Sequence, residues 1–260
     1  MTMPKTSTAK SPRAALVTGG AKRIGVAIVR ALAQAGYAVA VHARGARAEA
    51  DALCAEIAAS GGRAQTVVAE LADHDAVLGL VAAAVEAVGP LTLLVNNASE
   101  FQPDEIGKLD RERFDRQFAV NLRAPLFLVQ AFAAQAPEGA NTSVVNLLDQ
   151  RVYKLIPHFL TYGLTKSALH TATTTLAQAL APRLRVNAVA PGPTLPSPRQ
   201  HPSAFERQVQ TLPLGRAPSP EDVAGAVLYL AEAESVTGVT IAVDGGQRLA
   251  WQTPDMAIEE

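Results

Sequence analysis

The stretch Ala14–Gly25, AALVTGGAKRIG, decides the fold. It begins as a short apolar run and turns through two adjacent glycines, and a helical pattern then continues over Ile24–Ala35. Gly19 and Gly20 permit backbone angles that a Cβ would forbid, and Gly25 lets the helix start approach the sheet or a ligand. A helix N-terminus after such a turn offers free N–H groups and a positive dipole end. We therefore expect a pyrophosphate to bind there.

The spacing of these glycines alone leaves the ligand open. It is not the usual G-x-G-x-x-G, and it is not a Walker A loop, because Val26 follows Gly25 where Lys and Ser or Thr would be needed. The alternative is an ordinary glycine turn between a strand and a helix.

Short apolar runs and long helical stretches alternate along the rest of the chain. Further strands are expected at Ala38–His42, Ala64–Val68, Leu91–Asn96, Val144–Leu148, Val186–Ala190 and Val239–Val243. Further helices are expected at Ala46–Ser60, Asp73–Val88, about Asp110–Gln135, Tyr162–Leu180 and Pro220–Ala231. The strands are continuously apolar, which is typical of strands buried on both faces. This pattern predicts an α/β fold: one Rossmann-type, doubly wound parallel sheet of about seven strands with helices on both faces.

One domain is expected over residues 13–250, between a disordered N-terminal tail (1–12) and a C-terminal tail (251–260). The stretch Pro191–Pro213 holds six prolines, a density that forbids a continuous helix. A long loop so late in a compact domain is more often a substrate lid than a linker.

Composition excludes several classes of function. Hydrophobic residues make up 48% of the 260 positions, enough for a core, and 23 basic against 24 acidic residues give a formal charge of -1. Such a balance does not favour nucleic acid or an anionic membrane as partner. The single cysteine, Cys54, and the lack of an apolar leader or membrane-length run favour a cytoplasmic protein. The five histidines show no metal-ligand spacing, and G-x-S-x-G is absent, so neither a metal site nor a hydrolase is expected.

Basic residues follow the second expected strand, Ala38–His42. Dinucleotide folds that bind NAD carry an acidic residue here for the ribose, but the sequence reads His42-Ala43-Arg44, and the first acid is Glu49. Arg44 and Arg47, with Lys22-Arg23 in the glycine turn, suit the 2′-phosphate of NADP. The alternative is that they are solvated surface charges.

Tyr162 and Lys166 are four residues apart and share one helix face. A free tyrosine, with a pKa near ~10, is a poor proton carrier at neutral pH. At about 5 Å and an effective dielectric of about 20, a lysine cation favours the phenolate by roughly 3 kcal/mol. The pair is therefore expected to lower the pKa of Tyr162 and make it a proton carrier, and the alternative is a surface helix pair.

With its motifs in order, the chain resembles the short-chain dehydrogenase/reductase family from roughly Ala14 to Leu249. The matching motifs are TGGAKRIG at 18–25, Asn96-Asn97-Ala98, Asn121, YGLTK at 162–166, Pro191-Gly192 and Asp244-Gly245-Gly246. The chain departs from the usual pattern at Asp149, where the family has Ser, at Ser99, where it has Gly, and at Arg23, where a second glycine is usual. These departures are similar to the pteridine reductase branch, as is the nearby Phe101.

The resemblance implies an NADPH-dependent pteridine reductase, with substrates such as dihydrobiopterin, dihydromonapterin or folate. It implies that Asp149 and Tyr162 relay protons, that Lys166 orients the nicotinamide ribose and that Asn121 supports the relay helix. The implied substrate contacts are Arg23, Ser99, Phe101, Asp149 and Tyr162. The implied cofactor contacts are Gly19, Arg23, Ile24, Gly25, His42, Arg44, Glu70, Leu71, Asn97, Ala98, Ser99, Tyr162, Lys166, Pro191, Gly192 and Thr194. A homotetramer is implied as well.

The chemistry of Asp149 supports the pteridine. Reduction of a C=N bond needs a proton on nitrogen and hydrogen bonds to an aminopyrimidine edge, which a carboxyl group provides. Beside a ketone, a carboxylate would repel the developing alkoxide. Two alternatives stay open: a reductase of another carbonyl or imine, and a cofactor-binding regulatory protein without turnover. Phe101 is expected to stack on the pterin, with a place in the core as the alternative.

Overall fold

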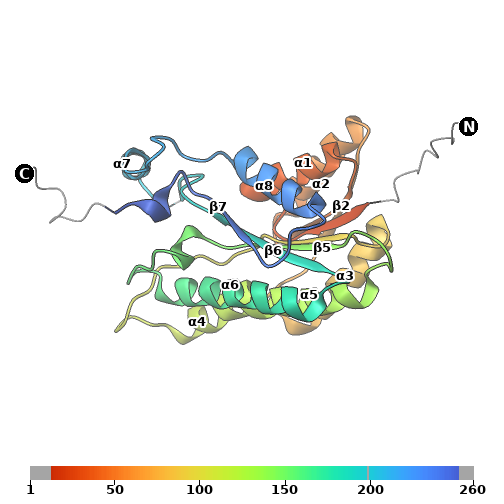
Figure 1. Cartoon of the computed structure of the whole chain (residues 1–260), viewed down its shortest axis with the longest axis horizontal. Coiled ribbons are helices and arrows are strands. Elements are labelled where there is room, and N and C mark those ends of the chain that lie inside the picture. The colour runs from red at the N-terminus through yellow and green to blue at the C-terminus, as the bar shows by residue number, and fades with distance from the viewer. Residues whose placement is uncertain (1–12, 198, 252–260) are drawn as a thin grey trace, which may run out of the picture.

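The computed structural model of the chain describes residues 13–197 and 199–251. The N-terminal tail expected at 1–12, and all but Trp251 of the C-terminal tail, lie outside the described residues. Seven parallel strands form one sheet in the order β3-β2-β1-β4-β5-β6-β7 (Figure 1). They are β1 (Ala14–Val17), β2 (Ala38–Ala43), β3 (Arg63–Val68), β4 (Leu93–Asn96), β5 (Ser143–Leu147), β6 (Arg185–Pro191) and β7 (Thr240–Val243).

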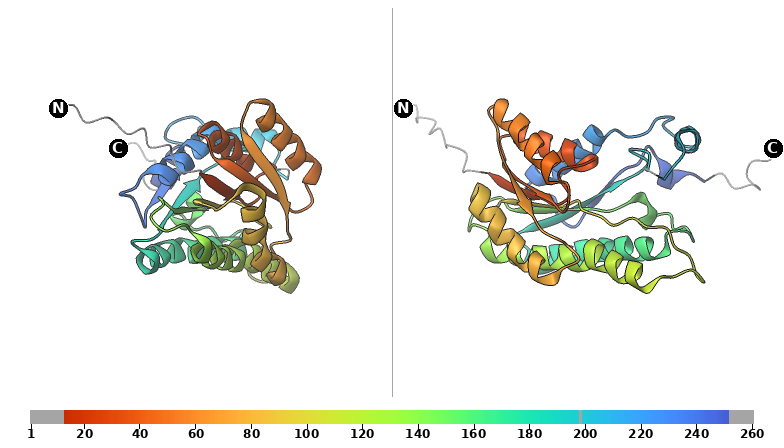
Figure 2. Two further views of the ribbon diagram at one scale, coloured as in Figure 1. Left: turned by 90° about the vertical axis from the view of Figure 1, so that its right-hand side faces the viewer. Right: turned by 180° about the vertical axis from the view of Figure 1, so that it is seen from behind.

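Helices cover both faces of the sheet, as Figures 1 and 2 show from three sides. One layer holds α1 (Ile24–Gln34), α2 (Arg47–Ala59) and α8 (Pro220–Glu232). The other holds α3 (His74–Val88), α4 (Arg111–Phe118), α5 (Ala124–Gln135) and α6 (Leu160–Leu180). The predicted doubly wound, Rossmann-type fold is confirmed. No helix in the described ranges is long and apolar enough to cross a membrane.

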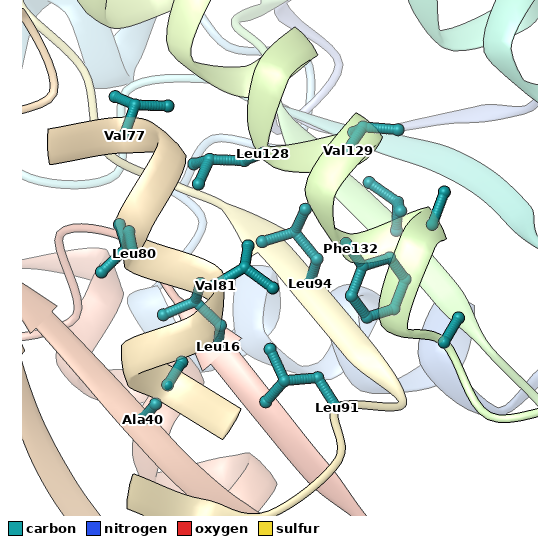
Figure 3. Packing of buried hydrophobic residues seen from close by; sticks show 14 of the residues in the cluster. Leu16, Ala40, Val77, Leu80, Val81, Leu91, Leu94, Leu128, Val129 and Phe132 are labelled. Atoms are coloured by element: carbon teal, nitrogen blue, oxygen red, sulfur yellow. The ribbon is translucent and has the colours of Figure 1, made fainter. Parts of the chain in front are cut away.

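A separate hydrophobic core lies on each face of the sheet. Leu16 of β1 and Leu94 of β4 are completely buried and pack with Val81 of α3 and Phe132 of α5 (Figure 3). Burying each such side chain contributes about 1.5–3 kcal/mol, so this core holds α3 and α5 to the strands. The neighbouring residues along each strand point to the opposite core, beneath α1 and α8.

Burial on both faces, expected of every strand, holds for the five inner ones. The edge strands differ. β3 alternates between buried and exposed residues, with Val68 52% exposed, and β7 is only partly buried. An edge strand lacks a neighbour on one side, so fewer elements cover its side chains.

Two local features differ from the predicted elements. The helical stretch expected over Asp110–Gln135 is interrupted by a π-helical segment, Ala119–Arg123, between α4 and α5. The proline-rich segment 191–213 contains a nine-residue helix, α7 (Pro202–Gln210). Pro202 occupies the first turn of α7, where a missing N–H costs no hydrogen bond, and no other proline lies within the helix, so the prolines of this segment do not exclude it.

The order of the strands creates a crevice at their carboxyl ends. β1 lies next to β4, and the helices that follow these two strands cover opposite faces of the sheet. Ligands of open α/β sheets bind where the strand order reverses in this way. The loops after β1, β4, β5 and β6 therefore meet at the edge where a site is expected.

Candidate active site at the carboxyl edge of the sheet

A cavity of about 680 Å³ lies at this edge. Its wall is formed by the glycine turn, the segments after β2, β3, β4 and β5, the first turns of α6, and residues within 191–197 and 199–208. This volume is in the range of cofactor and small-molecule sites. The substrate and cofactor contacts implied by the resemblance all line it, whereas Arg47, also expected near the 2′-phosphate, does not.

The glycine turn owes its shape to contacts within the protein. Gly19 has a φ of 62°, and a Cβ added at Gly25 would lie 2.2 Å from the Gly19 carbonyl oxygen. Gly25 is thus required because a side chain there would collide with the backbone of the turn itself. From the sequence, this glycine is instead expected to allow a close approach to the sheet or a ligand. Arg23 at the N-cap of α1 provides no side-chain cap, which leaves this helix end open to the cavity. Asn97 Nδ2 donates to the carbonyls of Thr18 and Gly19, at 2.8 and 3.1 Å.

His42 connects the turn to the end of β3. Its Nδ1 accepts from the Gly19 N–H at 3.0 Å, so Nε2 carries the proton and donates to the Ala69 carbonyl at 3.1 Å. Burial lowers the pKa of His42, in keeping with a neutral ring. Its contacts fix the backbone on which the cavity is built.

Two of the cations expected to meet a 2′-phosphate, Arg44 and Lys22, are paired with carboxylates. Arg44 Nη1 lies 3.6 Å from Glu100 and 3.9 Å from Glu70, and Lys22 Nζ lies 2.9 Å from Glu49. The Lys22–Glu49 pair is exposed, and in the Arg44–Glu100 pair Arg44 is exposed while Glu100 is only 18% exposed. Ion pairs at exposed cations are weak, so a phosphate could replace a carboxylate there. Arg47, by contrast, pairs with Asp51 on α2 and does not line this cavity.

Asn121 lies in the π-helical segment behind the cavity wall, completely buried. Its Nδ2 donates to the Glu100 carbonyl at 2.8 Å and to Thr165 Oγ1 at 3.2 Å. Its Oδ1 accepts from the Glu100 N–H at 2.8 Å and from Ser99 Oγ at 3.3 Å. One amide thereby joins the loop after β4 to α6, but it does not itself line the cavity.

Asp149, Tyr162 and Lys166 meet at the floor of the cavity. The Tyr162 hydroxyl donates to Asp149 Oδ2 at 3.0 Å, and Lys166 Nζ donates to the Leu147 carbonyl at 2.7 Å. Lys166 Nζ is 5.7 Å from the centre of the Tyr162 ring. Both side chains are buried, so the surface-pair alternative does not describe them.

The pKa values of this pair move in unexpected directions. The pKa of Tyr162 is raised well above its ordinary 10.0, first by burial and then by the charge of Asp149. Burial lowers the pKa of Lys166 from 10.5 to about 8. The expectation that Lys166 brings the pKa of Tyr162 down is therefore wrong for the protein alone. Desolvation of the phenolate outweighs the lysine, and a carboxylate is the nearest charged group.

Phe101 belongs to an aromatic pair. Its ring stacks on Phe159 with centres 4.4 Å apart and planes 6° apart, and it meets the Tyr162 ring edge-on at 4.7 Å. Phe159 has a φ of 61°, an unusual angle for a side-chain-bearing residue. Phe101 thus lines the cavity, but Phe159 already occupies one face of its ring.

The segment after β6 is held at two places. Arg23 donates to the carbonyls of Leu195 and Pro196, at 3.1 and 3.0 Å. Arg199 donates to the Phe101 carbonyl at 2.6 Å. The resemblance implies a place for Arg23 at the pyrophosphate or the substrate, whereas in this structure its guanidinium lies against the segment that covers the cavity.

Several cavity residues are not indicated by the sequence motifs: Gln150, Arg151, Arg199, Phe205, Gln208 and Gln247. Arg151 lies two residues after Asp149 and donates to its carboxylate. A basic residue so close in sequence to the proposed catalytic acid could have indicated it as a site residue. The others come from the segment 192–210 or from the chain after β7, apart from Gln150, and no motif marks them.

Comparison with known proteins adds four findings. The family model described as enoyl-(acyl carrier protein) reductase matches residues 19–248. The solved structure of FolM alternative dihydrofolate reductase 1 from Brucella canis, complexed with NADP, is 53% identical, with a TM-score of 0.91 over 94% of this chain and 97% of that one. A short-chain dehydrogenase/reductase from Serratia marcescens is 31% identical, with a TM-score of 0.85 over 91% and 98%. An uncharacterised oxidoreductase of Methylorubrum extorquens is 37% identical over 91% of this chain and 98% of its own length.

Proposed function

Because the chain belongs to the short-chain dehydrogenase/reductase family, we propose that it is an NADPH-dependent reductase whose substrate is a pteridine. The observation that carries this proposal is the 3.0 Å hydrogen bond from Tyr162 to Asp149, at the position where the family usually has Ser. The similarity to FolM alternative dihydrofolate reductase supports the same substrate class.

The residues present fit NADPH, which when bound supplies the hydride. The cavity at the strand-order reversal is large enough, and the start of α1 faces it without a side-chain cap. We assign the pyrophosphate to the turn at Gly19–Gly25 and the 2′-phosphate to Arg44 with Lys22. The remaining contacts would come from His42, Glu70, Leu71, Asn97, Ala98, Ser99, Tyr162, Lys166, Pro191, Gly192 and Thr194.

Tyr162 is the residue that we assign to proton transfer. Since its pKa is raised well above 10, the hydroxyl keeps its proton at every physiological pH, so the proton is present to be transferred, but the phenol is a weaker acid than a free tyrosine and needs a cation to stabilise its phenolate. Giving that proton to a ring nitrogen leaves a phenolate near Lys166, whose cation would stabilise the charge. Asn121 holds α6 in place through Thr165, beside the residues that react.

Asp149 favours a pteridine over a ketone. Its carboxylate is an acceptor of hydrogen bonds, and the N–H groups of an aminopyrimidine ring are donors. Reduction of a ketone instead builds negative charge on oxygen, which a neighbouring carboxylate destabilises. Phe101 would contact the pterin with the part of its ring that Phe159 leaves open.

The test is NADPH oxidation with 7,8-dihydrobiopterin, dihydromonapterin and dihydrofolate, with a panel of simple ketones alongside and NADH as control. We expect turnover of a pteridine with NADPH and little with NADH. In Asp149→Ser we expect pteridine reduction to fall and ketone reduction to stay or rise. Ketone turnover without pteridine turnover by the unaltered enzyme would refute the assignment.

Assembly and location complete the proposal. The family implies a homotetramer formed through α6 and the helix before it, and Leu164 of α6, 48% exposed, is an apolar side chain open to such a contact. Light scattering after size exclusion would measure the mass, and a monomer would contradict the tetramer. A cytoplasmic location, which supplies NADPH, is also proposed.

A further inference from the structure

Arg151 holds the Asp149 carboxylate from both sides. It lies in a short 3-10 helix, Gln150–Val152, that begins directly after Asp149. Its backbone N–H donates to Asp149 Oδ1 at 2.9 Å, and its Nη1 donates to Oδ2, also at 2.9 Å. The carboxylate cannot rotate without breaking at least one of these bonds.

The guanidinium is itself held in place by the aromatic pair. Its central carbon lies 5.5 Å from the ring centre of Phe101 and 5.4 Å from that of Phe159. The Arg151 side chain is only 20% exposed, and its Nε is buried without a hydrogen-bond partner among the described residues. A flat cation beside aromatic rings is stabilised there, and leaving would expose both rings.

Asp149 Oδ2 is shared between two donors, the Arg151 guanidinium and the Tyr162 hydroxyl. The charged groups around Tyr162 are Asp149 and Arg151 after β5 and Lys166 on its own helix. The loop after β4 contacts Tyr162 through the Ser99 hydroxyl and the Phe101 ring, which are both uncharged. Arg151 and the Tyr162 hydroxyl thus bind the same carboxylate oxygen, which places the positive charge of Arg151 near the phenol.

We propose that Arg151 is a positioning residue for proton transfer, which fixes Asp149 against the Tyr162 hydroxyl and sets the pH range in which Tyr162 gives up its proton. The inference rests on the proposed function, because it takes Tyr162 as the proton donor. Burial and Asp149 raise the pKa of Tyr162, and the charge of Arg151 acts in the opposite direction. Without Arg151 the phenol would be a weaker acid, and the carboxylate would be free to turn.

A direct test follows the Tyr162 hydroxyl without any turnover. The chain has four tyrosines, and replacing all of them with 3-fluorotyrosine gives ¹⁹F NMR signals that titrate at lower pH than tyrosine itself. The Tyr162 signal is the one missing from Tyr162→Phe. In Arg151→Gln we expect its titration midpoint to rise by about one to two pH units.

Two further variants make this test decisive. Arg199→Gln removes another cation near the Phe101 ring, at 5.7 Å, whose hydrogen bonds go to the Phe101 carbonyl and Gln102 and not to Asp149. It should leave the midpoint where it is. Arg151→Lys keeps the charge without the planar fork and should lie between the native protein and Arg151→Gln. Equal midpoints in native and Arg151→Gln protein, or in the Lys and Gln variants, would overturn the proposal.

Kinetics give a second readout. For Arg151→Gln we expect kcat with a dihydropterin to fall about 10- to 100-fold, with a shifted pH profile and NADPH affinity within about twofold of the native value. A lower kcat with an unchanged profile would mean that Arg151 is merely structural. If the native enzyme reduces ketones but no pteridine, the proposed function fails, while the fluorine titration still decides the role of Arg151.

Discussion

The Tyr162 hydroxyl donates a 3.0 Å hydrogen bond to Asp149 Oδ2, which joins the first turns of α6 to the segment after β5. Each residue depends on the other, because the acid orients the hydroxyl and its charge raises the pKa of the phenol. This relationship distinguishes the site from one built on Ser and Tyr, in which no charge faces the phenol.

Removing the Tyr162 hydroxyl should stop proton transfer and leave cofactor binding in place. For Tyr162→Phe we expect kcat to fall about 10²- to 10⁴-fold, the usual contribution of one acid–base group, with NADPH affinity changed little. Steady-state kinetics and NADPH fluorescence titration measure the two quantities. Full activity in this variant would exclude Tyr162 as the proton donor.

Lys166 should give the protein a distinctive dependence of stability on pH. Its folded pKa of about 8 is below the ordinary 10.5, so between these values the unfolded chain binds more protons. The free energy of unfolding therefore rises with pH in this window and is lowered below pH 8. Tyr162 acts above pH 10 with the opposite sign, since its folded pKa is raised and stability is then lost as pH increases.

Lys166→Met isolates the lysine, because it keeps much of the buried stem without the charge. The variant lacks the cost of burying a charged lysine, a cost that is largest at low pH. We therefore expect its free energy of unfolding, relative to that of the native protein, to fall by about 2 kcal/mol between about pH 7 and pH 10. Urea unfolding at several pH values measures this difference. A difference that does not vary with pH would show that burial does not lower the pKa of Lys166.

Arg44 should determine the preference for NADPH. Arg44→Ala would remove the charge-assisted contact that we assign to the 2′-phosphate, and we expect NADPH affinity to fall about tenfold while NADH affinity stays the same. Arg47→Ala is the matched control, since Arg47 is paired with Asp51 away from the cavity. Equal losses from the two substitutions would mean that only the overall charge of this corner matters.

Gly25 should be indispensable to the fold of the glycine turn. In Gly25→Ala the new methyl would lie 2.2 Å from the Gly19 carbonyl oxygen and 2.9 Å from Gly20 Cα, both backbone atoms. We expect a loss of about 3 kcal/mol or more in the free energy of unfolding. Gly79→Ala on α3 has open space around it and should stabilise the protein by up to about 1 kcal/mol. Thermal and denaturant unfolding compare the two variants.

The sequence is sufficient to predict the sheet and the edge at which the site lies. Buried parallel strands are apolar throughout, and their carboxyl ends share an edge, so apolar runs such as Leu91–Asn96 indicate where the cavity forms. The π-helical segment at Ala119–Arg123 is not predictable in this way, because one extra residue in a helical turn leaves no mark in the hydrophobic pattern. Helix α7 is not predicted because the density of prolines around it argues against a helix, although Pro202 occupies its first turn.

Side-chain partners are the least predictable part of the site. Phe101 and Phe159 are far apart in the chain and stack only because the loop after β4 is bonded to the start of α6, through Asp104 and the N–H of Phe159. The direction of the Tyr162 pKa shift escapes the sequence for a similar reason. Helical spacing indicates Lys166 as a neighbour, whereas the depth of burial and the approach of Asp149 depend on tertiary structure.

The two anchors of the segment after β6 have a thermodynamic consequence. Arg23 donates to it from the glycine turn, to which we assign the pyrophosphate, and Arg199 within the segment donates to the carbonyl of Phe101, which we assign to the pterin. A ligand that draws either arginine away changes the restraint that the other ligand meets. If the two ligands bind as we propose, their affinities are linked, and linkage is reciprocal: the factor by which NADPH changes pterin affinity equals the factor by which the pterin changes NADPH affinity.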